Sequence, residues 1–245
     1  MAAWSDSGIS TRLFMSDLKS ISQVKKVLNN RVLVRTKYKA VEARTKGGIY
    51  LISPSDLDWR PAEHTNRISE VVLPPERLDF NKRPDSMPWD TDMELQKGDI
   101  VWHDFMAAHN CPVLRTAEEP EEEYKLLSYY DIYLAKRGEE FIPLNGYVLC
   151  EEVKEEKSKL EIDNKINKKL GKVVYLGKPN RSYKDSKATD EADIQEGDII
   201  IKRREDIHIL LESAEHQQLD KPYFIIQRKD IYAKYETSHS NNSRA

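Results

Sequence analysis

The sequence LQKGDIV at residues 95–101 returns as IQEGDII at residues 194–200. In both stretches the pair Gly-Asp stands directly before a run of apolar, β-branched residues. A Gly-Asp pair is typical of a turn, and the run that follows it is typical of a strand. Because the whole pattern recurs 99 residues later, the sequence predicts that one strand-forming unit is built twice.

The repeated pattern continues on both sides of this stretch. Downstream, YYDIYLAK at 129–136 resembles RKDIYAKY at 228–235, and the two DIY triplets are again 99 residues apart. Two upstream pairs extend the match: RVLV at 31–34 with YVLC at 147–150, and EVVL at 70–73 with KVVY at 172–175. Their offsets of 116 and 102 residues place extra residues between the strand-like runs of the first copy, where loops tolerate insertions.

Both copies are rich in short runs of β-branched and aromatic residues, and neither has a long amphipathic helical pattern. We therefore predict an all-β protein of two tandem, partly open β-barrels, because closing a barrel covers strand edges that an open sheet would expose. The predicted organisation is an N-terminal extension at 1–28, domains at 29–138 and 139–236, and a disordered polar tail at 237–245.

The N-terminal extension contains apolar residues at roughly helical spacing. They are Ile9, Leu13, Leu18, Ile21, Val24 and Leu28. This spacing predicts a short helical segment that docks on the first domain. An organelle transit peptide is an alternative because the segment also contains Ser, Lys and Arg, but Asp6 and Asp17 argue against it, since such peptides avoid acidic residues.

The composition narrows the function classes. Hydrophobic residues make up 39% of the chain and charged residues 33%, which favours small domains with much surface over one thick core. The net charge of −3 gives no indication of a nucleic-acid or membrane partner, and no apolar run approaches the roughly 18 residues of a membrane span. The two cysteines, Cys111 and Cys150, are too few for a disulfide framework, so we expect a reducing, cytoplasmic compartment.

The stretch KGGIYL at 46–51 combines two opposite signals. Its glycines, Gly47 and Gly48, follow a run of charged residues, as in a mobile loop, whereas Ile49, Tyr50 and Leu51 are residues that proteins normally bury. A loop that remains mobile until it binds a partner would explain the combination. The alternative is a glycine turn that leads into an ordinary strand.

The order of these motifs resembles that of the GroES-like co-chaperonins, which are the lids of group I chaperonin cages. The resemblance covers residues 29–136 through RVLV, GGIYL, EVVL, KGDIV and DIYLAK, and residues 144–235 in the second copy. The two-domain layout is similar to that of the tandem co-chaperonins of chloroplasts. The resemblance implies two GroES-like barrels, with Gly48, Ile49, Tyr50 and Leu51 binding the chaperonin and Gly47 as the hinge.

The second copy departs from this family pattern. In place of the glycine-containing loop it has EEKSKLEIDNKIN, which contains no glycine pair. Under the resemblance, Leu160 and Ile162 are the reduced equivalent of the chaperonin-binding residues. The first copy departs too, because its segments around Trp59 and Trp89 are long. Under the resemblance, ERLDFNKRPD at 76–85 falls where the family's ring-roof hairpin would lie.

The resemblance implies a homo-oligomeric co-chaperonin that caps a group I chaperonin ring and assists protein folding. ATP would be used by the partner, so no cofactor of its own is expected. One alternative is a structural or assembly protein, for example of a virus, that keeps the fold without binding a chaperonin. Another is a barrel that binds a small molecule or nucleic acid. The corresponding alternatives for location are an organelle stroma or matrix, or a virion.

Other constellations are weaker. The ligand types in His103, His109 and Cys111 suit zinc, but H-x5-H-x-C is not a zinc pattern, so we expect a surface loop and no metal there. The acidic run at 118–123 is typical of a solvated hairpin tip, and no nucleophilic triad or phosphate-binding loop appears, so no enzyme is predicted. The basic stretch at 168–184 continues into acidic residues, which favours a solvated face.

Overall fold

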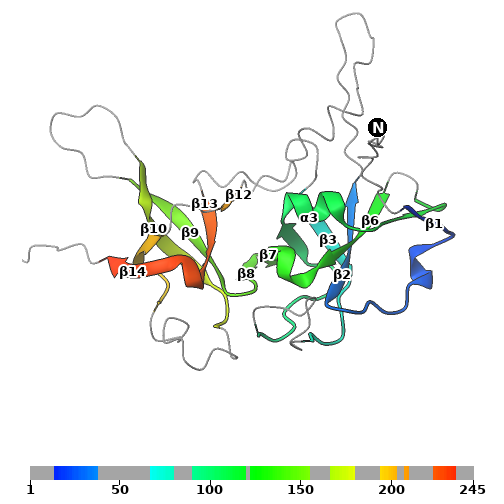
Figure 1. Ribbon diagram of the computed structural model, residues 1–245, viewed down its shortest axis with the longest axis horizontal. Helices are drawn as coiled ribbons and strands as arrows, with labels where there is room; N and C mark the ends of the chain where they lie inside the picture. The colour runs from blue at the N-terminus through cyan, green and yellow to red at the C-terminus, as the bar shows by residue number, and fades with distance from the viewer. Residues whose placement is uncertain are drawn as a thin grey trace, which may run out of the picture. The chain divides into compact units, whose positions relative to one another are not determined.

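The computed structural model describes residues 14–37, 67–79, 90–119, 122–154, 166–179, 194–202, 207–209 and 223–235. Over these residues the chain is mostly β-strand with almost no helix, which confirms the all-β prediction (Figure 1). The chain divides into two compact units: unit 1 comprises residues 1–76 and 95–131, and unit 2 comprises residues 77–94 and 132–245. The predicted domain boundaries stay predictions.

Unit 1 is a sheet whose strands run in the order β1-β5-β6-β2-β3-β4. The strands are β1 (Phe14–Leu18), β2 (Arg31–Lys37), β3 (Ile68–Leu73), β4 (Ile100–His103), β5 (Val113–Thr116) and β6 (Glu122–Ser128). Neighbouring strands are antiparallel except for the parallel pair β1 and β5. Among the described residues of the unit, three short helical elements interrupt the strands: η1 (Ile21–Gln23), α3 (Phe105–Asn110) and η2 (Tyr129–Asp131).

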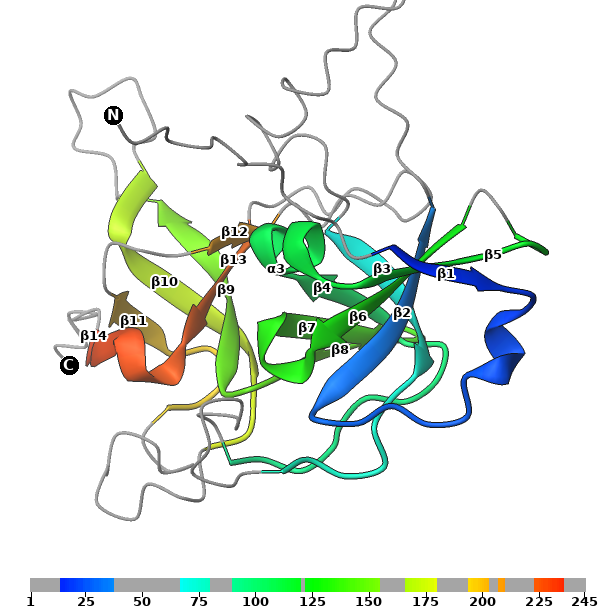
Figure 2. The same cartoon turned by 45° about the vertical axis from the view of Figure 1, so that its right-hand side comes forward.

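Unit 2 contains an antiparallel sheet with the strand order β12-β13-β9-β10-β11-β14, which Figure 2 shows from a second side. Its strands are β9 (Tyr147–Lys154), β10 (Ile166–Leu176), β11 (Ile199–Lys202), β12 (Ile207–Ile209), β13 (Tyr223–Gln227) and β14 (Ile231–Tyr235). A 3-10 turn, η4 (Arg228–Asp230), joins β13 to β14. The unit also contains an antiparallel hairpin of β7 (Ile132–Arg137) and β8 (Glu140–Pro143).

The Gly-Asp turn has the same structure in both units. Gly98 adopts a φ of +90°, and the side chain of Asp99 accepts a hydrogen bond of 2.7 Å from the N–H of Gln96. In unit 2, Gly197 adopts a φ of +91°, and the equivalent aspartate accepts the equivalent bond at 2.8 Å. Glycine tolerates this left-handed φ because it lacks a Cβ, and the aspartate satisfies a backbone donor of the turn.

A second backbone conformation recurs in both units, at the corner that precedes β2 in unit 1 and β9 in unit 2. Asn29 and Asn30 have φ values of 55° and 54°, and Asn145 and Gly146 have values of 52° and 69°. In both corners the first residue of the strand donates its N–H to the carbonyl three residues earlier, at 3.1 Å in unit 1 and 2.8 Å in unit 2. We call residues equivalent when they are 116 apart at these corners, 102 apart in β3 and β10, and 99 apart from the Gly-Asp turn onward.

Each unit has a cluster of buried hydrophobic residues against its sheet. In unit 1 the buried residues Val27, Leu33, Leu114 and Tyr124 form one cluster. In unit 2 a cluster forms around Val148, Cys150, Val173, Ile200 and Phe224. Val32, Leu33 and Val34 of β2 are all buried, as are Val148, Leu149 and Cys150 of β9. Because side chains of a strand alternate between its two faces, both faces of these two strands are covered.

The predicted N-terminal helix is wrong for the described part of the extension. Residues 14–28 form the strand β1 and the 3-10 turn η1, with no α-helix among them. The backbone of β1 pairs with β5, and Leu18, Ile21 and Val24 pack around the buried Val27. The three-residue spacing from Leu18 to Val27 therefore belongs to an irregular segment that packs on the core. Leu28, which the helical pattern included, is 62% exposed.

The predicted surface loop after the KGDIVW strand is also wrong, because residues 105–110 form α3. The side chain of Asp104 caps this helix by accepting a hydrogen bond of 2.8 Å from the N–H of Ala107. Six residues are too few for a recognisable amphipathic pattern, so only the capping aspartate indicates the helix in the sequence. Among the described residues, no helix is long and apolar enough to cross a membrane.

Candidate functional site

The residues predicted to bind a chaperonin lie outside the described residues. They are Gly47, Gly48, Ile49, Tyr50, Leu51, Leu160 and Ile162. The structure does describe the strands that precede and follow them.

The two predicted binding segments connect equivalent pairs of strands. Residues 38–67 join β2 to β3, and residues 155–165 join β9 to β10. In each pair the strands are antiparallel neighbours, so each connection begins and ends at the same edge of its sheet. In unit 2 the flanking residues Lys154 and Ile166 are themselves register partners.

An ion pair and a side-chain hydrogen bond fix the start of the first connection. Arg35 of β2 and Glu70 of β3 are register partners, and their charged groups lie 2.5 Å apart. The hydrogen bond that Arg35 donates to the Glu70 carboxylate raises the pKa of Arg35 above its usual value. Next to this pair, the hydroxyl of Thr36 donates to the carbonyl of Ile68 at 3.5 Å. These contacts hold the strand ends together where the connection leaves the sheet.

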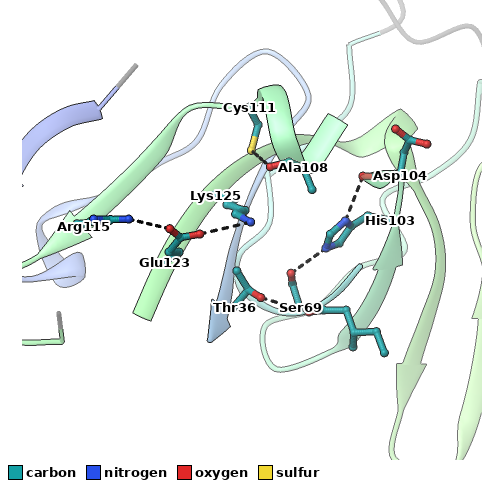
Figure 3. Close-up of polar contacts among 10 residues, drawn as sticks. Thr36, Ser69, His103, Asp104, Ala108, Cys111, Arg115, Glu123 and Lys125 are labelled. Atoms are coloured by element: carbon teal, nitrogen blue, oxygen red, sulfur yellow. Dashed lines mark hydrogen bonds and ion pairs between the residues drawn. The ribbon is translucent and has the colours of Figure 1, made fainter. Parts of the chain in front are cut away.

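Unit 1 also buries a polar pair that sequence analysis did not find. Ser69 Oγ lies 2.8 Å from His103 Nε2, and the other ring nitrogen of His103 lies 3.4 Å from the carbonyl of Asp104 (Figure 3). A carbonyl only accepts, so Nδ1 carries the proton and Nε2 accepts from the serine hydroxyl. Burial lowers the pKa of His103 to about 4, so the ring is neutral at pH 7.

A second set of charged residues lies on β5 and β6, on the other side of β2 from β3 and β4. Glu123 lies between two cations: Arg115 contacts one carboxylate oxygen at 2.9 Å, and Lys125 lies 3.5 Å from the other (Figure 3). The side chains of Glu123 and Lys125 are only 10% and 8% exposed. Buried charges are tolerated when they are paired in this way. We call the set of Ser69, His103, Glu123 and Lys125 the polar row.

The polar row contains a serine and a histidine, as a hydrolytic site does, but these side chains are not accessible from the solvent. A serine beside a histidine base is the arrangement that activates a nucleophile. Here, however, Ser69 is 4% exposed and His103 is 2% exposed, so a substrate does not reach either group in this structure. We therefore interpret the serine–histidine contact as the hydrogen bond that satisfies a buried imidazole.

The residues considered for a metal do not converge. His103 is engaged with Ser69, while Cys111 donates its thiol to the carbonyl of Ala108 at 3.3 Å. Burial raises the pKa of Cys111 to about 11, which keeps the thiol protonated. Within the described ranges, no group of three or more His, Cys, Asp and Glu side chains is arranged to hold a metal ion.

The carboxylates of the repeated motifs have structural partners. Asp99 caps the Gly-Asp turn and Asp104 caps α3. Glu119, in the acidic connection between β5 and β6, accepts a hydrogen bond from Tyr124. Burial raises the pKa of Asp131, and the charge of Asp104 adds to that rise. Asp99 and Asp104 therefore stabilise a turn and a helix N-terminus.

The polar row is specific to unit 1. The residue equivalent to His103 is Lys202, whose ammonium group lies 3.9 Å from the centroid of the Phe224 ring. Phe224 is equivalent to Lys125, and Gly171 is equivalent to Ser69. A Cβ at Gly171 would overlap the Cζ of Phe224, so the glycine makes room for the ring. Unit 2 thus replaces the hydrogen-bonded imidazole with a cation–π contact.

Comparison with known proteins finds no family model that matches the chain and no match among curated proteins.

Proposed function

We propose that the chain is a tandem GroES-like co-chaperonin that caps a group I chaperonin ring through residues 47–51. The observation that carries the proposal is the position of KGGIYL. It falls in the connection between the antiparallel neighbours β2 and β3, which belong to a frame whose turn and corner occur twice. The motif order around it supports the same function.

A single segment of this kind binds weakly. Full burial of Ile49, Tyr50 or Leu51 contributes about 1.5–3 kcal/mol each, so the gross gain is roughly 5–8 kcal/mol. Ordering the connection costs on the order of 1–2 kcal/mol per residue fixed, which cancels the gain over about ten residues. The net affinity of one segment is therefore low, which permits release.

Several copies of the segment bind well together. Once one segment of an oligomer is bound, the others meet the partner at a high effective concentration. A lid that closes and opens again needs this combination of weak single contacts and strong combined binding. The proposal therefore includes a homo-oligomer, with ATP hydrolysis in the partner.

The second candidate function is a structural or assembly role without chaperonin binding. The observation that favours it is the difference between the connections: 30 residues (38–67) join β2 to β3, whereas 11 residues (155–165) join β9 to β10. The shorter connection has no glycine pair, and Leu160 and Ile162 are separated by Glu161. If neither segment binds a chaperonin, this function replaces the first.

Co-sedimentation with a group I chaperonin ring, with and without ATP, tests the proposal. The wild-type chain is expected to sediment with the ring, and Ile49→Asp is expected to remain in the supernatant because a charge replaces a side chain that must enter an apolar groove. Met106→Asp is the matched control, since Met106 is an exposed apolar residue on α3. Leu160→Asp then reports whether the second connection contributes.

Two results would contradict the proposal. One is a wild-type chain that does not sediment with any group I ring in either nucleotide state. The other is an Ile49→Asp variant that sediments as well as the wild type and the Met106→Asp control.

A further inference from the structure

The segment at residues 14–24 lies at the margin of unit 1 and packs on its core. We call this segment the strap, and it contains the strand β1 and the turn η1. β1 is the last strand of its sheet and pairs in parallel with β5, as Figure 2 shows. The partly buried side chains of Leu18, Ile21 and Val24 pack against the apolar cluster of unit 1. The strap therefore covers a surface that the rest of the unit would otherwise expose.

The surface beneath the strap combines a strand edge with apolar side chains. β5 pairs with β6 on one side and with β1 on the other, so β5 becomes the edge of the sheet wherever β1 is absent. Leu114 of β5 and Tyr124 of β6 are register partners, and they are 7% and 1% exposed. Without the strap, unit 1 presents an open strand edge beside this apolar pair. The other members of the surface are Leu33, Val72, Leu73 and Leu126.

The contacts that attach the strap to β5 depend little on its sequence. The parallel ladder has three pairs of register partners, with an irregularity between Met15 and Leu18, and the N–H of Ala117 donates to the carbonyl of Leu18 at 3.1 Å. Among the described residues, the polar contacts of 19–24 stay within the strap. The attachment therefore consists of backbone hydrogen bonds and apolar packing, which another extended apolar segment can also provide.

The chain directly after the strap has anchors of its own. Val27 is buried in the apolar cluster of unit 1. The ammonium group of Lys26 lies 2.5 Å from the carboxylate of Glu76. Because these contacts lie between the strap and β2, release of the strap leaves the start of β2 in place.

We propose that the surface under the strap is a binding site for an extended apolar segment of another polypeptide, and that the strap occupies this site within its own chain. The bound segment adds a strand parallel to β5. Its apolar side chains, three residues apart, take the positions of Leu18, Ile21 and Val24. Addition of a strand to a sheet edge is a common mode of peptide recognition. The inference does not depend on chaperonin binding, and its test needs no chaperonin.

The strap limits access to this site because it competes from within the same chain. A segment tethered beside its site acts at an effective concentration in roughly the millimolar range. A free peptide therefore binds the wild type only by displacing the strap, and its apparent Kd is raised in inverse proportion to the fraction of chains whose site is open. A substitution that weakens the strap increases this fraction and tightens the binding of a free peptide.

Fluorescence anisotropy with a labelled peptide of the strap sequence, FMSDLKSISQV, tests this competition on the full chain. We expect the Ile21→Asp chain to bind the peptide roughly tenfold or more tightly than the wild type, because a charge replaces an apolar side chain that packs on the core. Lys19→Asp is the matched control, since it places the same side chain at an exposed position of the strap, and it is expected to bind like the wild type. A peptide that itself carries Ile21→Asp is expected not to bind.

Hydrogen exchange locates the bound peptide. β5 is expected to exchange faster in the Ile21→Asp chain than in the wild type, and added peptide is expected to restore its protection. Protection of β2 shows that the variant remains folded. If Ile21→Asp loses that protection, the comparison is made with the milder Ile21→Ala, which is expected to tighten peptide binding roughly threefold.

Three results would overturn the inference. The first is a folded Ile21→Asp or Ile21→Ala chain that binds the peptide no more tightly than the wild type and Lys19→Asp do. The second is a bound peptide that protects a region other than β5. The third comes from sedimentation velocity of the Ile21→Asp chain: a new dimer that excess peptide does not dissociate would show that a second copy of the chain occupies the site.

Discussion

The contact between Gly171 and Phe224 gives the sharpest test of the core of unit 2. A Cβ at Gly171 would overlap the Cζ of the ring, and it would lie 3.2 Å from the ring's Cε1 and 3.4 Å from the Cβ of Cys150. Phe224 is fully buried, and Lys202 lies 3.9 Å from its centroid. The ammonium group of Lys202 therefore lies over the ring, and Gly171 lies close to its outer atoms. A methyl group at position 171 forces the strands or the ring to shift.

The expected loss follows from two opposing effects of Gly171→Ala. Overfilling a packed core costs about 1–3 kcal/mol. Replacing glycine by alanine also restricts the unfolded chain, which stabilises the fold by about 0.4–1 kcal/mol. The net result is a loss of about 1–2 kcal/mol in the free energy of local opening.

Hydrogen exchange with mass spectrometry is the suitable assay because it reports each unit separately. Peptides from β9 and β10 are expected to exchange about 5- to 30-fold faster in Gly171→Ala, since 1.4 kcal/mol corresponds to a factor of ten. Peptides from β2 and β3 are expected to be unchanged. Ser69, the equivalent residue in unit 1, already has a Cβ and serves as the internal comparison.

A second background isolates the cause. In Phe224→Leu the side chain lacks the outer ring atoms, so adding Gly171→Ala is expected to cause no further loss. If Gly171→Ala accelerates exchange equally in both backgrounds, the ring is not the cause of the loss. If it accelerates nothing in the wild-type background, the packing described for unit 2 is wrong.

Two further predictions concern unit 1 and the repeated turn. Burial lowers the pKa of His103 from 6.5 to about 4, so the unfolded chain binds a proton at a higher pH than the folded chain does. Stability is therefore expected to fall as the pH drops from about 6.5 to 4, by about 3 kcal/mol in total, and urea titrations of the wild type and His103→Gln should differ in slope over that window. Gly98→Ala and Gly197→Ala are each expected to cost about 1 kcal/mol in their own unit, because both glycines have a left-handed φ and a Cβ would meet no atom within 4 Å. Hydrogen exchange of β3 and β10 measures the two losses, and clearly unequal values would contradict the equivalence of the turns.

The repeated turn was predictable because its cause is local. Gly98 supplies the left-handed φ, and Asp99 supplies the acceptor for a nearby backbone N–H. Both requirements fall within four residues of sequence, so the pattern LQKGDIV contains them completely. The same holds for the all-β class, since short β-branched runs and the lack of long amphipathic patterns indicate it directly.

The N-terminal segment was not predictable in the same way, because its structure depends on residues far away in the sequence. The apolar spacing of residues 18–27 fits a helix, yet β1 obtains its hydrogen bonds from β5, about 100 residues later. Pairing with a distant strand leaves no sign in the segment itself. Val27 is buried and Leu28 is exposed, whereas the helical periodicity would bury Leu28.

The contact of Ser69 with His103 shows the same limit within a candidate site. Their strands, β3 and β4, are antiparallel neighbours, but only the register places the two side chains 2.8 Å apart. The sequence alone groups His103 with His109 and Cys111, which are close to it along the chain, and gives no indication of its contact with Ser69.

The equivalence of the two units also explains why one polar row exists and not two. At the three equivalent positions, Lys202, Gly171 and Phe224 change together: the ring needs the space that glycine leaves, and the ring then receives the ammonium group. Exchanging any one of them for its unit 1 counterpart would leave a clash, a cavity or a buried charge without a partner. The interior residues that contact one another therefore differ together between the two units. The Gly-Asp turns and the asparagine corners have the same geometry in both units, because residues close in sequence determine it. We therefore expect a function common to both units to involve the turns, the sheet edges and the connections between strands. The interior residues of each unit stabilise its fold.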